Sequence, residues 1–314
     1  MGRSKTVRYA AAQWRRLSRV RPRAPQRLDS TTDDRDAEGI APSSATAVEP
    51  LHGTYVGNNR VLVRVRGGGR LFVSADDISL MPELVTEGGY DAPFMAFLRR
   101  TLGPNSVFVD VGANVGLFTV VGALQAWRGR VIAYEAAPDV ADLLRDNVQL
   151  NWLLDRVTVR PVAVADRPGR RPFHFDRRLQ LLGGLSVAGS EASTGVVDVV
   201  TLDDELREFE QIDLVKIDVE GGEAEVIAGM DRLLEEGRVA RISCEVRTDA
   251  FERVGRYAEW PLLVGTLEHM ENAGWAFALI GTDGTEQSRS VEEIVASEPH
   301  PNVVARRPGM AFAS

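Results

Sequence analysis

The sequence has little cysteine, little lysine and no long hydrophobic run. Cys244 is the one cysteine among 314 residues, so an intrachain disulfide is excluded, which fits a reducing compartment. No segment approaches the roughly 18 to 20 apolar residues that span a bilayer. The basic N-terminus is not followed by the apolar stretch of a signal peptide. We therefore expect a cytoplasmic protein without a transmembrane segment.

Charge is distributed unevenly along the chain. The formal net charge is −8, but residues 1–50 carry ten Lys/Arg against six Asp/Glu, which leaves −12 for the rest. A body this acidic repels phosphate backbones, so we expect no nucleic-acid partner for the folded part. Lysine occurs twice, at Lys5 and Lys216, and arginine supplies the other positive charges. Lys216 therefore stands out within the acidic body.

Composition divides the chain into three parts. Residues 1–50 are first basic and then rich in Asp, Ser, Thr, Ala and Pro, which predicts a disordered tail with a short helix over 7–20. Residues 51–104 predict a small β-hairpin and a helix that pack on the core. Residues 105–314 predict the main, ligand-binding domain.

Strands and helices alternate through the main domain, a pattern typical of a mostly parallel, doubly wound α/β sheet with helices on both faces. We expect seven strands in this sheet and an irregular insert over 166–200. The predicted strands lie at 107–111, 130–135, 157–165, 213–219, 239–246, 275–280 and 303–305. The predicted helices lie at 92–102, 116–127, 139–151, 223–234 and 262–273. In such sheets a ligand binds at the carboxyl ends of the strands, where the strand order reverses.

The turn after the first of these strands indicates the kind of ligand. Gly112 and Gly116 allow a tight turn and a close approach of the backbone to a ligand. Glu135, at the end of the next strand, can accept hydrogen bonds from both hydroxyls of a ribose. Asp110 occupies the position of the first glycine in dinucleotide-binding turns, and the third glycine of that pattern is missing as well. A carboxylate there repels a diphosphate and attracts the ammonium and sulfonium groups of S-adenosylmethionine, so the turn favours that cofactor.

The fourth strand of the main domain carries charge where a central parallel strand is normally apolar. If the strand stays regular, Lys216, Asp218 and Glu220 share one face, and Glu245 ends the next strand. Carboxylates oppose the loss of a lysine proton, so we expect Lys216 to organise Asp218 and Glu220 rather than to act as a base. The three acids can converge on an acceptor hydroxyl or on a hard cation such as Mg²⁺, but they lack a defined ligand spacing, so no metal ligand is assigned. The alternative is a salt-bridged strand end in which Glu223 favours the next helix N-terminus.

Tyr90 precedes the first strand of the main domain. The segment around it, 81–92, must pass near the carboxyl edge of the sheet, so we expect Tyr90 to cover the cofactor. The start of a surface helix is the alternative. The four histidines show no metal-ligand spacing.

With these residues in view, the sequence resembles the FkbM family of S-adenosylmethionine-dependent methyltransferases. The matching segments are 108–116, 134–138, 147–151, 199–203 and 212–221 followed by Glu223. The resemblance implies a class I, Rossmann-like methyltransferase fold and methyl transfer to a hydroxyl of a sugar or polyketide-like natural product. It places the cofactor on Asp110, Gly112, Asn114 and Gly116, with Glu135 at the ribose. The sequence departs from the family's pattern at Ala136–Pro138, which replaces the commoner Pro-x-Pro, and at Gly222.

A hydroxyl is a poor nucleophile until its proton is removed, so we expect a carboxylate general base at Asp218 or Glu220. Three alternatives stay open: a nicotinamide-dependent oxidoreductase, a non-catalytic binding module and an N-methyltransferase. The sequence indicates neither the small-molecule acceptor nor the oligomeric state.

Overall fold

The computed structural model describes residues 52–175, 184–185, 195–246, 260–297 and 302–310. The chain divides into two units, residues 1–50 and 51–314, and the described residues belong to the second. The tail predicted over 1–50 and its helix over 7–20 lie outside the described residues.

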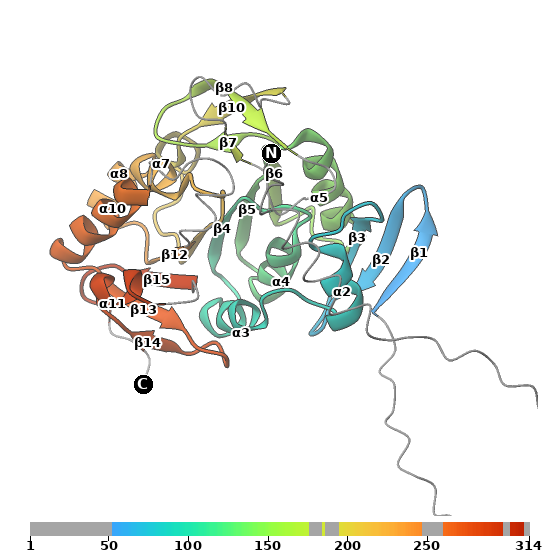
Figure 1. Cartoon of the computed structure of the whole chain (residues 1–314), viewed down its shortest axis with the longest axis horizontal. Helices are drawn as coiled ribbons and strands as arrows, with labels where there is room; N and C mark the ends of the chain where they lie inside the picture. Colours follow the sequence, from blue (N-terminus) through green and yellow to red (C-terminus); the bar gives the residue numbers. More distant parts are fainter. Residues whose placement is uncertain (1–51, 176–183, 186–194, 247–259, 298–301, 311–314) are drawn as a thin grey trace, which may run out of the picture. The chain divides into compact units, whose positions relative to one another are not determined.

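The described part of the second unit is built around an eight-stranded sheet with the order β14-β13-β15-β12-β11-β4-β5-β6 (Figure 1). Its strands are β4 (Val107–Val111), β5 (Arg130–Tyr134), β6 (Val157–Arg160), β11 (Leu214–Ile217), β12 (Arg241–Glu245), β13 (Ala276–Ile280), β14 (Glu286–Ser288) and β15 (Asn302–Arg306). The five strands from β6 to β12 are parallel, and β15 runs antiparallel to both β12 and β13. The chain proceeds outward from β4 to β6 and returns to β11, so the strand order reverses between β4 and β11.

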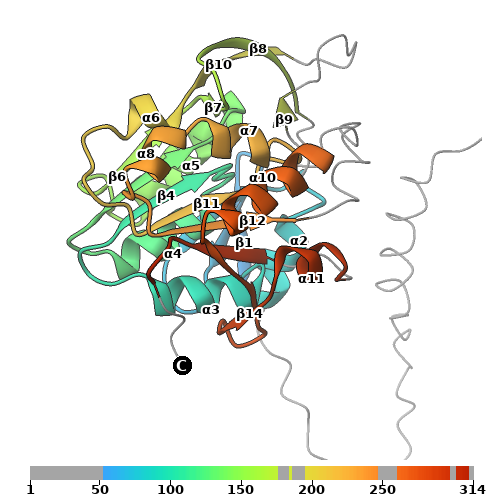
Figure 2. The same ribbon diagram turned by 90° about the vertical axis from the view of Figure 1, so that its left-hand side faces the viewer.

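Helices cover both faces of this sheet (Figure 2). Consecutive side chains of a strand point to opposite faces, so Phe108 joins one hydrophobic core while Val109 joins the other. The first core includes α3 (Ala92–Thr101), α4 (Leu117–Gln125) and α5 (Pro138–Leu150). The second includes α7 (Glu223–Ala228), α8 (Asp231–Glu235), α10 (Trp260–Asn272) and α11 (Val291–Val295). The doubly wound α/β fold expected from the sequence is confirmed, with β14 as an additional edge strand beyond the seven expected.

A three-stranded antiparallel sheet precedes the main sheet, where the sequence predicted a two-stranded hairpin. Its strands are β1 (Gly53–Gly57), β2 (Arg60–Arg64) and β3 (Arg70–Ser74). The turn predicted at 67–69 joins β2 to β3, and its three glycines have positive φ angles. The helix α2 (Met81–Glu87), which the sequence did not predict, follows the sheet.

Two asparagines, Asn147 in α5 and Asn151 at its C-terminal cap, attach this small sheet to the core. Asn147 accepts the Phe72 N–H at 2.6 Å and donates to the Phe72 carbonyl at 2.9 Å. Asn151 makes the same pair of contacts with the backbone of Arg70, at 2.8 and 2.7 Å. Asn147 and Asn151 are four positions apart, a rise of about 6 Å along a helix. Phe72 and Arg70 are two positions apart, about 6.6 Å along a strand, so each asparagine lies opposite one of these residues of β3. Asn147 also donates to the Val115 carbonyl at 2.8 Å, which ties the sheet to the turn after β4.

The segment between β6 and α7 differs from the predicted pattern. The strand expected over 157–165 ends at Arg160, and β7 (Ala163–Val164) belongs to a separate sheet of order β7-β10-β8-β9. The other strands of that sheet are β8 (Gly169–His174), β9 (Gly184–Leu185) and β10 (Gly195–Val200), and the helix α6 (Leu202–Glu205) follows. The helix predicted over 223–234 is divided into α7 and α8. The division falls at Gly229, where an added Cβ would lie 2.2 Å from the Ala165 carbonyl oxygen.

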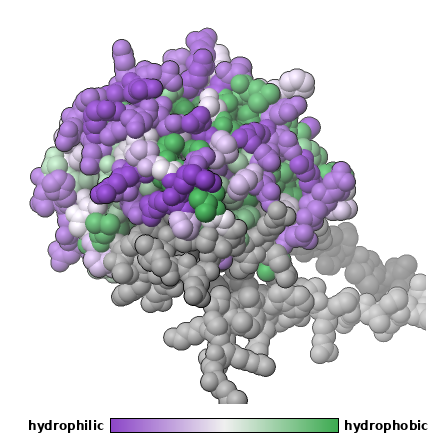
Figure 3. All heavy atoms as spheres, turned by 90° about the horizontal axis from the view of Figure 1, so that it is seen from above, coloured by the Kyte–Doolittle hydropathy of each residue, from purple (hydrophilic) through white to green (hydrophobic). Residues whose placement is uncertain are grey.

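Hydrophilic residues dominate the face shown in Figure 3, with smaller hydrophobic areas between them. Individual large side chains are exposed, among them Trp152 at 89% and Trp127 at 50%. Single exposed apolar residues are normal on soluble domains. Among the described residues, each helix is too short or too polar to cross a bilayer.

Candidate active site

The sequence-predicted site residues lie where β4, β5, β11 and β12 end. The Asp218 N–H donates to the Val111 carbonyl at 3.0 Å, so the end of β11 follows the end of β4 closely. Gly112 has a φ of +78°, and an added Cβ would lie 1.8 Å from the Asp218 carbonyl oxygen. The close contact between the two strand ends therefore requires glycine at position 112.

The turn after β4 is held by backbone contacts with the end of β5. The N–H groups of Gly112 and Ala113 donate to the Tyr134 carbonyl at 3.0 and 2.9 Å. The Asn114 N–H donates to Glu135 Oε2 at 2.9 Å, and Asn114 itself has a φ of +52°. This turn therefore brings Asn114 and Glu135 together, as the sequence predicted for a cofactor site.

Glu135 is oriented by two backbone donors. Its Oε2 accepts from Asn114, and its Oε1 accepts the Ala137 N–H at 2.8 Å. Burial raises the pKa of Glu135 to about 7, against the lowering effect of these two N–H groups. Each carboxylate oxygen can accept a second hydrogen bond, which a hydroxyl of a bound ligand can donate.

Lys216 lies between two carboxylates. Its Nζ is 3.1 Å from Asp218 Oδ2 and 3.6 Å from Asp110 Oδ1, and 5.0 Å from the centre of the Phe118 ring. The Asp218 contact was expected from the sequence, whereas the Asp110 contact was not. Burial lowers the pKa of Lys216, but the charges of Asp218 and Asp110 outweigh it, so the pKa is raised and the ammonium is retained.

Asp110 is fully buried. Its Oδ2 accepts the Thr119 hydroxyl at 2.6 Å, while its Oδ1 has no hydrogen-bond partner among the described residues. Burial raises the pKa of Asp110 although Lys216 and Thr119 lower it. Asp110 therefore contacts Lys216 and Thr119 in this structure, and its contact with a cofactor stays a prediction.

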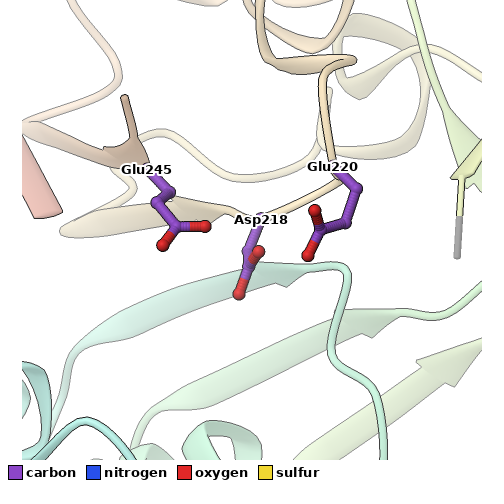
Figure 4. Close-up of side chains that lie close together, drawn as sticks. All are labelled: Asp218, Glu220 and Glu245. Carbon is purple, nitrogen blue, oxygen red and sulfur yellow. The ribbon is translucent and has the colours of Figure 1, made fainter. Parts of the chain in front are cut away.

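Three carboxylates, those of Asp218, Glu220 and Glu245, lie close together (Figure 4). Within the described part of the chain, Asp218, Glu220 and Glu245 each offer an oxygen atom within 4.8 Å of the others. The convergence was predicted, but the predicted reason was wrong. The strand β11 ends at Ile217 and Glu220 has a φ of +53°, so a turn rather than strand alternation returns Glu220 to the group.

The segment before α3 lies against this acidic group. Asp91 begins α3 by accepting the Phe94 N–H at 3.1 Å, and its other oxygen accepts from Asn302 of β15. Asn302 is the register partner of Glu245, so the contact ties the segment to the end of β12. Burial, followed by the charges of Asp218 and Glu245, raises the pKa of Tyr90. Tyr90 therefore lies near the acidic group, and its contact with a cofactor stays a prediction.

Sequence reasoning did not assign Glu223 or Asn302 to the site, and it named Asp91 only beside Tyr90, as part of a cover for the cofactor. An acid in the first turn of a helix, as Glu223 is, gives no signal beyond helix stabilisation. The other two meet across 211 positions of sequence, and β15 must be placed beside β12 before the pairing can be seen.

The region that contains these residues matches a known protein family. A sequence model described as the methyltransferase FkbM domain matches residues 110–277. The methyltransferase sdnD of Sordaria araneosa is 28% identical over 180 residues, which cover 48% of this chain and 67% of sdnD. The 31-O-demethyl-FK506 methyltransferase FkbM of Streptomyces tacrolimicus is 32% identical over 162 residues, and the 2-O-methyltransferase NoeI of Sinorhizobium fredii is 30% identical over 152. These matches cover 41% and 43% of this chain, and 61% of each relative.

Among solved structures, the O-methyltransferase from Bacillus cereus in complex with SAH is similar at 15% identity, with a TM-score of 0.40. The match covers 68% of this chain and 78% of that one. The family match spans more than half of the chain and includes the end of β4 and all of β5, β11 and β12, where the site lies. The chain belongs to the family of methyltransferase FkbM domains.

Proposed function

We propose that the protein is an S-adenosylmethionine-dependent methyltransferase that acts on a hydroxyl of a sugar or a polyketide-like natural product. The observation that carries the proposal is the pairing of a Glu135-centred turn with a group of three carboxylates at the same edge of the sheet. The family supports methyl transfer, and the names of the relatives NoeI and FkbM, both O-methyltransferases, support oxygen as the acceptor atom.

The residues of the turn fit this cofactor. Glu135 would hold the ribose hydroxyls, because both of its oxygens are aimed by backbone N–H groups and retain acceptor capacity. Asp110 has a buried oxygen without a hydrogen-bond partner among the described residues, and several acids surround Lys216. This excess of negative charge favours a cationic ligand over a diphosphate. When bound, S-adenosylmethionine supplies a methyl group on a positively charged sulfur.

The chain's own part in the reaction is to orient the acceptor and take its proton. In the proposed mechanism a carboxylate oxygen of Asp218 or Glu220 accepts the hydroxyl proton as the oxygen becomes the nucleophile. Lys216 engages Asp218 Oδ2. In the proposed complex, Oδ1 of Asp218 or the Glu220 carboxylate would face the acceptor. Glu245 would contact a neighbouring hydroxyl of the acceptor, and Tyr90 would cover the cofactor. Alignment of the two reacting atoms supplies much of the remaining acceleration.

Mg²⁺ is the alternative occupant of the acidic group, since carboxylate oxygens are the ligands it prefers. In that case the cation, rather than a free carboxylate, would orient the acceptor oxygen. Turnover that survives EDTA would contradict this alternative, and loss of turnover that Mg²⁺ restores would support it.

The experiment is a screen with radiolabelled S-adenosylmethionine against sugar nucleotides, glycosides and macrolides, with peptide amines as the competing class. We expect label on a hydroxyl oxygen; label on a nitrogen instead would contradict the oxygen acceptor. Asp218→Asn and Glu220→Gln should each keep cofactor affinity, and turnover should fall by about 10²–10⁴-fold in the variant that removes the base. Unchanged turnover in both would refute the general-base assignment, and a wild-type chain that binds no S-adenosylmethionine would refute the proposal itself.

A further inference from the structure

Glu223 is a buried acid that the proposed mechanism does not use. It is the first residue of α7 and is 2% exposed. Its Oε1 accepts two backbone N–H groups, from Val219 at 3.3 Å and from Gly221 at 3.2 Å. These two donors flank Glu220, so one carboxyl oxygen holds the backbone on both sides of that residue.

The segment that Glu223 holds has an unfavourable backbone conformation. Glu220 has a φ of +53° and Gly221 a φ of +96°, so two consecutive residues lie in the left-handed region. A non-glycine residue in this region is strained and keeps the conformation only where its surroundings hold it. The strand β11 has already ended at Ile217, so the strand hydrogen bonds do not extend over residues 219–221. The two contacts with Glu223 are therefore placed to stabilise this turn.

We propose that Glu223 is a positioning residue, whose Oε1 clasps the Val219 and Gly221 amides and thereby holds the Glu220 carboxylate beside Asp218 and Glu245. The inference rests on the proposed function only for the role of Glu220, because the clasp itself is a property of the folded chain. It predicts that the acceptor oxygen at position 223, and not its negative charge, is what the site requires.

The ordinary role of an acid at this position makes the opposite prediction. A negative charge in the first turn of a helix is stabilised by the helix dipole, and Asp serves that role as well as Glu. Burial raises the pKa of Glu223 to about 7, so a neutral glutamine is a close substitute in charge as well as shape. Gln keeps an oxygen at the reach of Oε1, whereas Asp keeps the charge and is shorter by one methylene.

The test compares Glu223→Gln with Glu223→Asp by hydrogen exchange at the amides of Val219 and Gly221. The clasp predicts exchange within about twofold of wild type in Glu223→Gln. It predicts about fivefold faster exchange in Glu223→Asp, because a hydrogen bond contributes roughly 1 kcal/mol and that energy corresponds to about fivefold. Glu225→Asp is the matched control: Glu225 lies in the same helical turn, but its carboxylate pairs with Arg171 at 3.0 and 3.1 Å. We expect the control to leave both amides unchanged.

Faster exchange in Glu223→Gln than in Glu223→Asp would overturn the proposal, as would equal exchange in all three variants. Because the readout needs no acceptor, the clasp can be supported even if the methyl-transfer screen fails. Once an acceptor is known, Glu223→Asp should lower kcat and leave the affinity for S-adenosylmethionine unchanged. Glu223→Gln should keep the kcat of wild type. A parallel loss of kcat and cofactor binding in Glu223→Asp would indicate general destabilisation and contradict a positioning role.

Discussion

Replacing Lys216 with methionine would remove the cation shared by Asp110 and Asp218 while keeping a side chain of similar length. Lys216 is 6% exposed, and its ammonium lies 3.6 Å from Asp110 and 3.1 Å from Asp218. Methionine can fill the space beside Phe118 but cannot compensate either carboxylate. The change therefore isolates the electrostatic contribution of the lysine.

The cost comes mainly from Asp110. Asp218 has a side chain that is 34% exposed, so water screens its charge and its pair with Lys216 contributes about 0–1 kcal/mol. Asp110 is fully buried, and its Oδ1 has no hydrogen-bond partner among the described residues. Removing one partner of a buried ion pair costs about 3–5 kcal/mol because the other charge is left uncompensated. We expect Lys216→Met to lower the free energy of unfolding by about 3–5 kcal/mol at pH 8.

The cost should shrink as the pH falls. The folded-state pKa of Asp110 is raised above its usual value of 3.8. A carboxyl with a raised folded pKa favours the folded state below its unfolded pKa, and this advantage is lost as the pH rises through the folded pKa. Lys216 lowers the pKa of Asp110, so the methionine variant should raise it further. At about pH 5 a larger fraction of the Asp110 carboxyl is therefore protonated in the variant than at pH 8. The penalty for leaving its charge uncompensated is then smaller.

Urea denaturation of wild type and Lys216→Met at pH 8 and pH 5 measures both quantities. The double variant Asp110→Asn, Lys216→Met removes both charges and should recover part of the lost stability, a coupling that a double-mutant cycle quantifies. A loss below about 1 kcal/mol at pH 8 would refute the reasoning, since it falls within the range of an exposed pair. An equal loss at both pH values would refute it as well.

Two further predictions concern the turn after β4 and the attachment of the three-stranded sheet. Because the pKa of Glu135 is about 7 and its carboxylate form is the better acceptor, the affinity for S-adenosylmethionine should rise by about tenfold from pH 6 to pH 8, and Glu135→Gln should flatten this dependence in calorimetric titrations. A wild-type affinity that falls with pH would contradict the ribose role. Asn147→Asp should destabilise the chain by about 2–4 kcal/mol in urea denaturation, because it loses the bonds that Asn147 donates to the carbonyls of Phe72 and Val115. Asn151→Asp, at a partly exposed position, should cost about 1 kcal/mol, and equal losses in the two variants would count against the proposed attachment.

Local sequence patterns were sufficient for the elements that position the site. The apolar run at 107–111 predicted β4 to the residue, and glycines 112 and 116 marked the turn that follows it. Apolar runs bounded by turn residues identify buried strands because strands of a parallel sheet are covered on both faces. The strand predicted over 213–219 is longer than β11, which ends at Ile217. The Asp218 N–H still bonds to the Val111 carbonyl of β4, although Asp218 is not part of the strand.

Contacts across the sheet could not be derived from local patterns. The pair between Lys216 and Asp110 joins positions 106 residues apart, and it depends on β11 lying directly beside β4. Alternation along a strand correctly grouped Lys216 with Asp218, since the two side chains form an ion pair, and the Lys216 ammonium lies over the Phe118 ring of α4. The same alternation predicted the correct neighbours for Glu220 but placed it on a regular strand, whereas Glu220 lies in a left-handed turn. A Glu-Gly pair does not indicate such a turn until the end of the strand is known.

The central claim is that the acidic edge between β4 and β11 binds a cationic nucleoside cofactor. Isothermal titration of the wild-type chain with S-adenosylmethionine, alongside NAD⁺ under the same conditions, tests it most directly. The account predicts saturable binding of S-adenosylmethionine and none of NAD⁺. Binding of NAD⁺, or of neither ligand, would contradict it.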